Sequence, residues 1–190
     1  KYDRLDVLVN NAGAVFDKRT LTPDGLESTW AVNHLAYFLL TNLLLPLLEK
    51  SAPSRIVNTS SRSHYSGKLD LDDPGYEKGG YWITTAYARS KLANVLFTRE
   101  LAKRLAGKGV IAICLHPGVV ATNIWTKAPA FAKPVLWLYQ KLAMITHDNL
   151  VFTCGSVLSC VPVYPHYRTL LFLPLAHVFA RVIAYVTLRA

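Results

Sequence analysis

Short apolar runs alternate with longer leucine-rich segments over the first 115 residues of the chain. The apolar runs at residues 5–9, 55–59 and 110–115 have the length and composition of buried strands. The segments at residues 24–50 and 85–106 have the length and periodicity of helices. This alternation predicts an α/β domain built on a parallel sheet.

Proline and glycine mark the expected ends of the two helices. Pro23 and Asp24 stand at the start of the first helix, and Pro46 is expected to kink or end it. Gly107 and Gly109 are expected to close the second helix.

Each predicted strand is followed by a polar or glycine-containing loop. The three loops begin with Asn10-Asn11-Ala12-Gly13, Ser60-Ser61-Arg62 and His116-Pro117-Gly118. In open parallel sheets, ligands bind beyond the carboxyl ends of the strands. The three loops are therefore candidate walls of one site.

The composition fits one globular domain. The 190 residues are 52% hydrophobic, which is enough for a sizeable core. The net charge of +9 is spread out, because residues 1–150 hold 18 Lys and Arg against 12 Asp and Glu. No dense basic stripe appears, so nucleic-acid binding is not expected.

The cysteines indicate neither a disulfide framework nor a metal site. Cys114, Cys154 and Cys160 are odd in number and have no paired spacing. Reduced thiols fit a cytosol-facing protein best. Residues 1–6 carry charges with no apolar run behind them, so no signal peptide is expected there.

Tyr87 and Lys91 form a Tyr-x-x-x-Lys pair in the second predicted helix. Residues four apart share a helix face, so the ammonium can lie beside the phenol and favour its phenolate form. A tyrosine whose pKa is brought closer to neutrality can act as a general acid or base toward an alcohol oxygen. Alone, such a pair is also a common surface arrangement.

Five motifs in order resemble the short-chain dehydrogenase/reductase family over roughly residues 4–124. They are Asn10-Asn11-Ala12-Gly13, Asn33, Ser60-Ser61, Tyr87-x-x-x-Lys91 and Pro117-Gly118. The stretches Val32-Asn33-His34-Leu35 and Ser90-Lys91-Leu92-Ala93-Asn94 look like the retinol dehydrogenase branch of that family. The resemblance implies a Rossmann-like, doubly wound parallel sheet.

The resemblance also divides the chain into three parts. Residues 1–124 would be the catalytic part of the domain, residues 125–149 a loop over the substrate, and residues 150–190 an atypical apolar tail. The tail lacks the helix and closing strand that the family pattern places after about residue 145. Its run from residue 170 to 188 approaches a membrane span in length, but Pro174, His177 and Arg181 interrupt it.

The resemblance assigns four catalytic residues. Tyr87 would be the general acid and base, and Lys91 would hold the nicotinamide ribose and keep the pKa of Tyr87 low. Ser61, or its rival Ser60, would donate a hydrogen bond to the substrate oxygen. Asn33 would hold a water beside Lys91 in a proton relay, or would satisfy a kinked helix, or both.

The same resemblance implies an NADP(H) cofactor, with NAD as the open alternative. The Asn10–Gly13 loop would pass the adenosine side, and the stretch after the third strand would contact the carboxamide. The implied cofactor residues are Asn10, Ala12, Gly13, Tyr87, Lys91, Pro117, Gly118, Val120 and Thr122.

The implied substrate is a small hydrophobic alcohol or aldehyde, such as retinol or retinal. Trp125, Phe131, Trp137 and Tyr139 would line its pocket, or else pack on the core or a membrane surface. Members often pair as homodimers through the helices that carry Asn33 and Tyr87. The expected location is the cytoplasm or the cytosolic face of a membrane, with endoplasmic reticulum and mitochondrion open.

One departure from the pattern weakens the cofactor assignment. No Thr-Gly-x-x-x-Gly-x-Gly sequence occurs in the 190 residues, and the first recognisable strand is the one the family places fourth. The fold is therefore expected to be incomplete, with its first βαβ unit and diphosphate cradle missing. The alternative interpretation is a truncated, catalytically inactive product that does not bind cofactor.

Overall fold

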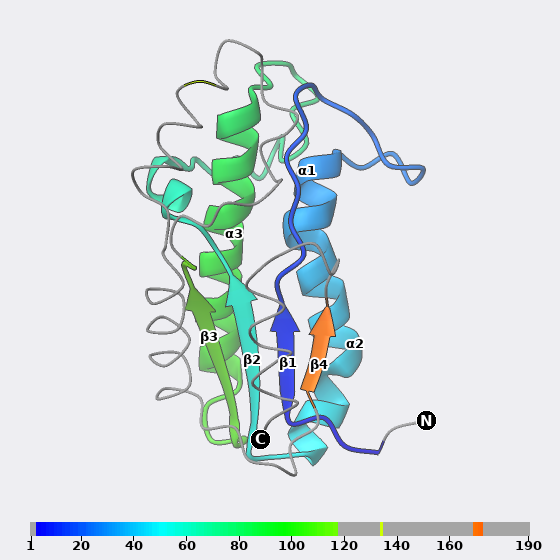
Figure 1. Ribbon diagram of the computed structural model, residues 1–190, viewed down its shortest axis with the longest axis vertical. Coiled ribbons are helices and arrows are strands. Elements are labelled where there is room, and N and C mark those ends of the chain that lie inside the picture. The colour runs from blue at the N-terminus through cyan, green and yellow to red at the C-terminus, as the bar shows by residue number, and fades with distance from the viewer. Residues whose placement is uncertain (1–2, 118–133, 135–168, 173–190) are drawn as a thin grey trace.

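The computed structural model describes residues 3–117, residue 134 and residues 169–172 of the chain. Its centre is a parallel sheet of four strands in the order β3-β2-β1-β4 (Figure 1). The strands are β1 (Val7–Asn10), β2 (Ser54–Thr59), β3 (Val110–Leu115) and β4 (Thr169–Phe172). The first three confirm the strands predicted from the apolar runs.

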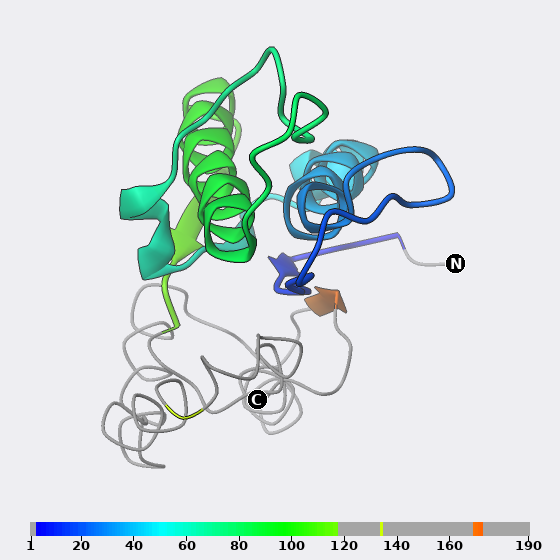
Figure 2. The same cartoon turned by 90° about the horizontal axis from the view of Figure 1, so that it is seen from above.

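Two long helical segments cover one face of this sheet (Figure 2). The first is continuous from α1 (Ser28–Trp30) through the π-helix η1 (Ala31–Leu35) into α2 (Ala36–Lys50). The second is α3 (Ile83–Arg104), and the short 3₁₀ helix η2 (Arg62–Ser66) follows β2. Within residues 3–117 and 169–172, no helix covers the other face of the sheet.

The alternation of side chains along the strands explains the position of the helices. Leu8 and Ile56 are fully buried in a cluster with leucines of α2 and α3, including Leu48 and Leu101. The neighbouring strand positions Val7, Val9 and Val57 form a separate cluster. Because successive strand residues point to opposite faces, the helices bury the face that carries Leu8 and Ile56.

The first helical segment starts four residues later than predicted and ends at the predicted residue, Lys50. It begins at Ser28 because the Glu27 carboxylate accepts hydrogen bonds from the backbone N–H groups of Thr29 and Trp30, at 2.8 and 2.7 Å. Pro46 was expected to kink or end the helix. It does not end the helix, because α2 runs on to Lys50. Packing of Leu48 into the core accompanies this last turn.

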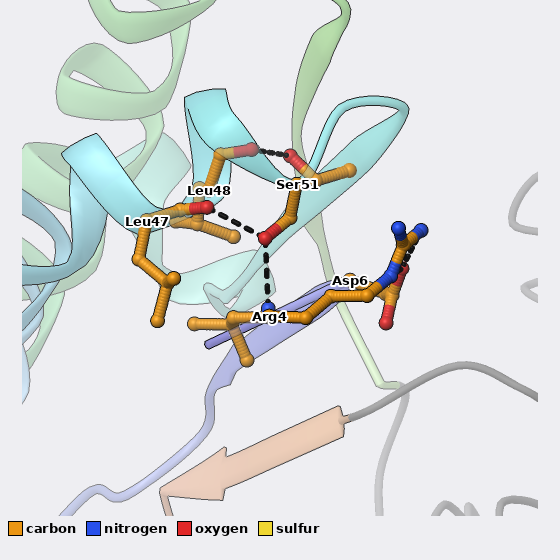
Figure 3. A network of polar contacts seen from close by, with 7 residues as sticks. Arg4, Asp6, Leu47, Leu48 and Ser51 are labelled. Carbon is orange, nitrogen blue, oxygen red and sulfur yellow. Dashed lines mark hydrogen bonds and ion pairs between the residues drawn. The ribbon is translucent and has the colours of Figure 1, made fainter. Parts of the chain in front are cut away.

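Ser51 ties the end of α2 to the start of the sheet. Its Oγ accepts from the backbone N–H of Leu5 at 2.9 Å and donates to the carbonyl of Leu47 at 2.7 Å. Figure 3 shows these bonds beside the Arg4–Asp6 ion pair, whose shortest separation is 2.6 Å. The first helical segment is thereby fixed against β1.

The apolar tail contributes one strand to the sheet, contrary to the expectation that no closing strand is present. β4 pairs in parallel with β1, with Val7 opposite Thr169 and Asn10 opposite Phe172. Pairing supplies hydrogen-bond partners to a sheet edge that would otherwise be open. The rest of the tail lies outside the described residues. The expected substrate loop at residues 125–149 also lies outside them, apart from residue 134.

Candidate active site

The register of the sheet brings the predicted loops to one edge. Asn10 lies opposite Asn58, and Asn58 lies opposite Cys114, so the carboxyl ends of β1, β2 and β3 are level. The loops that follow these strands therefore start side by side. The described part of the third loop ends at Pro117, and Gly118, Val120 and Thr122 lie outside the described residues.

The Asn10 side chain lies in a buried hydrogen-bond network at the strand ends. Its Nδ2 donates to Thr41 Oγ1 at 2.9 Å and to Asn58 Oδ1 at 2.8 Å. Asn58 in turn donates to Thr98 Oγ1 on α3 at 2.8 Å. This fully buried network joins the strand ends to both long helices, so the Asn10 amide orders the scaffold.

The loop after β1 reaches the centre of the site through Gly13. A Cβ atom at this position would lie 3.4 Å from Asn33 Oδ1 and 3.6 Å from Lys91 Nζ. Ala12 is held behind it, since Tyr37 donates its hydroxyl to the Ala12 carbonyl at 2.8 Å. The missing side chain of Gly13 leaves room for close approach to Lys91.

Lys91 is buried on α3 and directed at the end of β2. Its Nζ donates to the carbonyl of Thr59 at 3.1 Å and lies 5.6 Å from the ring centroids of Tyr87 and Tyr37. Burial lowers the pKa of Lys91 to about 8, and Cys114 opposes this shift. The ammonium is therefore still mostly charged at neutral pH.

Tyr87 and Ser61 are brought together, although they are 26 positions apart in the chain. A hydrogen bond from the Ser61 side chain lowers the pKa of Tyr87, but the larger effect of burial raises it above its usual value. The expectation that Lys91 keeps this pKa low does not hold in the described structure. Loss of hydration around the phenolate outweighs an ammonium 5.6 Å from the ring centroid.

Ser60 and Ser61 have separate environments. The Ser60 hydroxyl is buried and donates to the main-chain carbonyl of Lys91 at 2.8 Å. Ser61 is partly exposed and bonds to Tyr87, and its Oγ lies 3.2 Å from Ser63 Oγ. Of this pair, Ser61 is the serine that bonds to Tyr87.

Asn33 lies in the π-helix η1 and is fully buried. Its amide bonds twice to Ala14, accepting from the N–H and donating to the carbonyl, each at 2.8 Å. Its Nδ2 also donates to Ser90 Oγ at 3.2 Å. The side chain thus holds the loop after Gly13 against both helices, while π-helical turns are frequent at functional sites.

Asn94 and His34 belong to the same cluster, and sequence reasoning did not select them. Asn94 Nδ2 donates to the carbonyl of Asn33 at 2.8 Å, and His34 Nδ1 lies 3.0 Å from Asn94 Oδ1. For Asn94, spacing was a signal that the sequence contained, because Asn94 follows Lys91 by three residues and therefore shares its helix face.

The arrangement fits part of a nicotinamide dinucleotide. Lys91 Nζ lies near the backbone of Gly13 and the ring of Tyr87. A hydroxyl, an ammonium and a close backbone suit the ribose next to a nicotinamide ring. No glycine-rich loop for a diphosphate occurs in the part of the chain that the structure describes. The same residues contain no group of three His, Cys, Asp or Glu side chains that could hold a metal ion.

The site and sheet define a class of protein that comparison with known families confirms. Residues 1–132 match the family model of the short chain dehydrogenases, and the chain belongs to this family. Within it, the chain lies in the retinol dehydrogenase-like branch. It is 46% identical to retinol dehydrogenase 13 of Homo sapiens over 147 residues and 50% identical to retinol dehydrogenase 14 of Mus musculus over 165 residues.

These matches cover most of this chain but only part of each relative. They span 73% and 84% of the chain, and 44% and 48% of the two relatives, so the chain spans about half of their length. An uncharacterised protein from Mycobacterium paratuberculosis has a crystal structure with a TM-score of 0.58 at 43% identity, covering 72% of this chain and 50% of that one. A dehydrogenase/reductase from Sinorhizobium meliloti, at 22% identity and a TM-score of 0.55, covers 81% and 55% and supports the fold alone.

Proposed function

We propose that this chain supplies the proton-transfer half of an oxidoreductase site. The site would act with NADP(H) on a hydrophobic alcohol or aldehyde such as retinol or retinal. The observation that carries the proposal is the grouping of Ser61, Tyr87 and Lys91 beyond the carboxyl ends of β1 and β2. The retinol dehydrogenases among its relatives supply the substrate class.

The proposed chemistry follows from the charges of these groups. Because burial raises the pKa of Tyr87, its hydroxyl keeps its proton at neutral pH and can give it to a carbonyl oxygen. Ser61 donates a second hydrogen bond to the same oxygen and stabilises its developing negative charge. Lys91, charged at neutral pH, stabilises the phenolate that remains. When bound, the nicotinamide ring supplies the hydride.

The remaining roles are proposals of the same kind. Asn33 would connect Lys91 to solvent through a water, besides holding Ala14. The loop Asn10 to Gly13 would bind the adenosine side through its backbone. Residues 118–122 and 125–149 would complete the carboxamide contact and the substrate pocket. NADP is favoured over NAD here only by the resemblance.

A homodimer is the proposed assembly. Phe38, Leu39 and Leu43 on α2 are large apolar side chains that remain 48%, 59% and 68% exposed, and Leu96 on α3 is 41% exposed. Phe38 also contacts Phe97 of α3, with ring centroids 5.4 Å apart, so the two helices form one apolar surface. Exposed apolar surface of this kind usually marks an interaction site.

The cellular location is proposed to be the cytoplasm or the cytosolic face of a membrane. Among the described residues, the segment Ser28–Lys50 is long and apolar enough to cross a membrane by length and composition alone. The fully buried Asn33 and Thr41 on it pack against the sheet and the site, which favours a core helix.

Turnover tests the proposal. The longest natural form of the protein that contains these 190 residues is mixed with all-trans-retinal and either NADPH or NADH, and retinol is measured by chromatography. Formation of retinol with NADPH supports the proposal, and no turnover with either cofactor would refute it. The 190-residue chain is assayed in parallel for NADPH fluorescence and thermal shift, where no signal is expected; micromolar binding would contradict a need for the glycine-rich loop.

A further inference from the structure

Asn94 on α3 joins its helix to η1 and to the end of β2. Its Nδ2 donates to the carbonyl of Asn33 at 2.8 Å and to the carbonyl of Thr59 at 3.4 Å. Its Oδ1 lies 3.0 Å from Nδ1 of His34. Asn94 is fully buried, its two bonds to carbonyl oxygens are buried, and its contact with His34 is partly buried.

The two carbonyl oxygens determine how the amide is oriented. Carbonyl oxygens only accept hydrogen bonds, so the NH₂ group of Asn94 must face Asn33 and Thr59. Its Oδ1 then faces His34 and can only accept. His34 must therefore carry a proton on Nδ1, and burial, which lowers the pKa of His34, leaves Nε2 without one at neutral pH.

The Thr59 carbonyl is shared between Asn94 and Lys91. It accepts from Lys91 Nζ at 3.1 Å and from Asn94 Nδ2 at 3.4 Å. The direction of this carbonyl therefore sets the place of the buried ammonium. The other titratable groups facing Lys91 are Tyr87 on its own helix, Tyr37 on α2 and Cys114 on β3.

We propose that His34 and Asn94 are a pair of positioning residues. Together they fix the orientation of the Thr59 and Asn33 carbonyl groups and so hold the Lys91 ammonium beside Tyr87. As part of a catalytic site the pair rests on the proposed function, whereas its effect on Lys91 does not. His34 is connected to Lys91 through Asn94 and the Thr59 carbonyl, so its effect can be separated from packing by mutation.

The first test measures the wild-type chain and uses a substitution only to assign the signal. Nitrogen-15 NMR of the histidine side chains in the 190-residue chain reports which ring nitrogen of His34 is protonated, with His34→Phe used to assign the signal. The expected result near neutral pH is a protonated Nδ1 and an unprotonated Nε2. A protonated Nε2 with a bare Nδ1 would overturn the proposal.

The second test follows Lys91 itself by side-chain NMR across a pH titration. Asn94→Leu removes both donors at similar volume, and His34→Phe keeps the ring contacts with Trp30 and Phe97 but removes the Nδ1 donor. Without a locked Thr59 carbonyl, the charged form of Lys91 loses support, so its pKa is expected to fall by about half a pH unit or more in both variants.

Thr41→Val is the matched control. It removes one buried side-chain hydrogen bond, to Asn10, on the same helical segment as His34 but away from Thr59. The pKa of Lys91 is expected to stay unchanged in this variant. An equal shift in Thr41→Val, or no shift in His34→Phe, would overturn the proposal, and the second outcome remains decisive if Asn94→Leu does not fold.

These readouts separate the pair from the proposed function. The NMR measurements use the chain without cofactor and do not depend on turnover. If the natural form fails to reduce an aldehyde while the Lys91 shifts appear, the proposed function fails and the pair stands. If turnover is found but Lys91 does not respond, the pair fails alone.

Discussion

At the scale of single residues, the buried charge of Lys91 opposes folding. A positive charge removed from water is costly, and the structure offers Lys91 a carbonyl and two aromatic rings as surroundings. Residues kept in such a position at a cost to stability are commonly functional. The cost can be measured directly because it depends on pH.

Lys91→Met is expected to raise the free energy of unfolding at pH 7, by up to about 3 kcal/mol. The pKa of Lys91 is about 8 in the folded chain and near 10.5 when unfolded. Between these values the unfolded chain binds more protons, so the stability of the wild type rises with pH and the advantage of Met shrinks. Urea unfolding between pH 7 and 10 measures this, and a constant difference would contradict it.

Changing Ser60 to Ala is expected to lower stability, whereas changing Ser61 to Ala is expected to change the pKa of Tyr87. Ser60→Ala loses a buried hydrogen bond to the Lys91 carbonyl and should cost about 1 kcal/mol of stability. Ser61→Ala should leave stability nearly unchanged but raise the pKa of Tyr87 further, since the bond that lowers it is gone. Tyrosine NMR titration and urea unfolding measure the two effects, and reversed roles would assign the catalytic serine to Ser60.

At the scale of elements, the periodicity of the sequence was sufficient to predict β1, β2, β3 and α3. The predicted and observed bounds of these four elements differ by no more than two residues at every end. Local rules failed where tertiary contacts decide. Pro46 is tolerated inside α2, and the π-helix at Asn33 leaves no mark in an apolar periodicity. The pairing of β4 with β1 joins residues more than 150 positions apart, which no local pattern encodes.

The candidate site likewise contains residues that could be predicted from the sequence and residues that could not. Tyr87 and Lys91 could be selected from their residue types and spacing, and Ser61 from the family resemblance. His34 and Asn94 could not, because an amide and an imidazole on apolar helices have many uses, and only the fold shows which carbonyls they meet. The use of the Asn10 side chain within the scaffold was hidden for the same reason.

The contact of η2 with α3 depends on a glycine. A Cβ at Gly67 would lie 2.7 Å from the Ala88 carbonyl and 2.9 Å from Leu92 Cβ, although its φ of −68° suits any residue. Gly67→Ala is therefore expected to destabilise the protein by about 1–3 kcal/mol through overpacking. Gly75→Ala is the control, because its Cβ would meet Glu27 Cβ at an ordinary 3.6 Å. Thermal unfolding compares them, and equal melting temperatures would contradict the packing argument.

At the scale of the whole molecule, the apolar surface of α2 and α3 predicts self-association. The wild-type chain of 21.1 kDa is expected to sediment as a dimer at micromolar concentration, and Leu43→Glu as a monomer. Leu71→Glu is the control, because Leu71 is at least as exposed as Leu43 but lies in the loop before α3. A monomeric wild type, or dissociation by both variants, would argue against pairing through these helices.

The central claim is that Tyr87 transfers the proton, and that the other residues of the site position Tyr87 and stabilise its phenolate. The most direct test is turnover of retinal with NADPH by wild type and Tyr87→Phe, in the longest natural form that contains these residues. Removal of the one hydroxyl is expected to lower kcat by about 10²–10⁴-fold while NADPH affinity stays nearly the same. Equal kcat values for the two proteins would contradict the account.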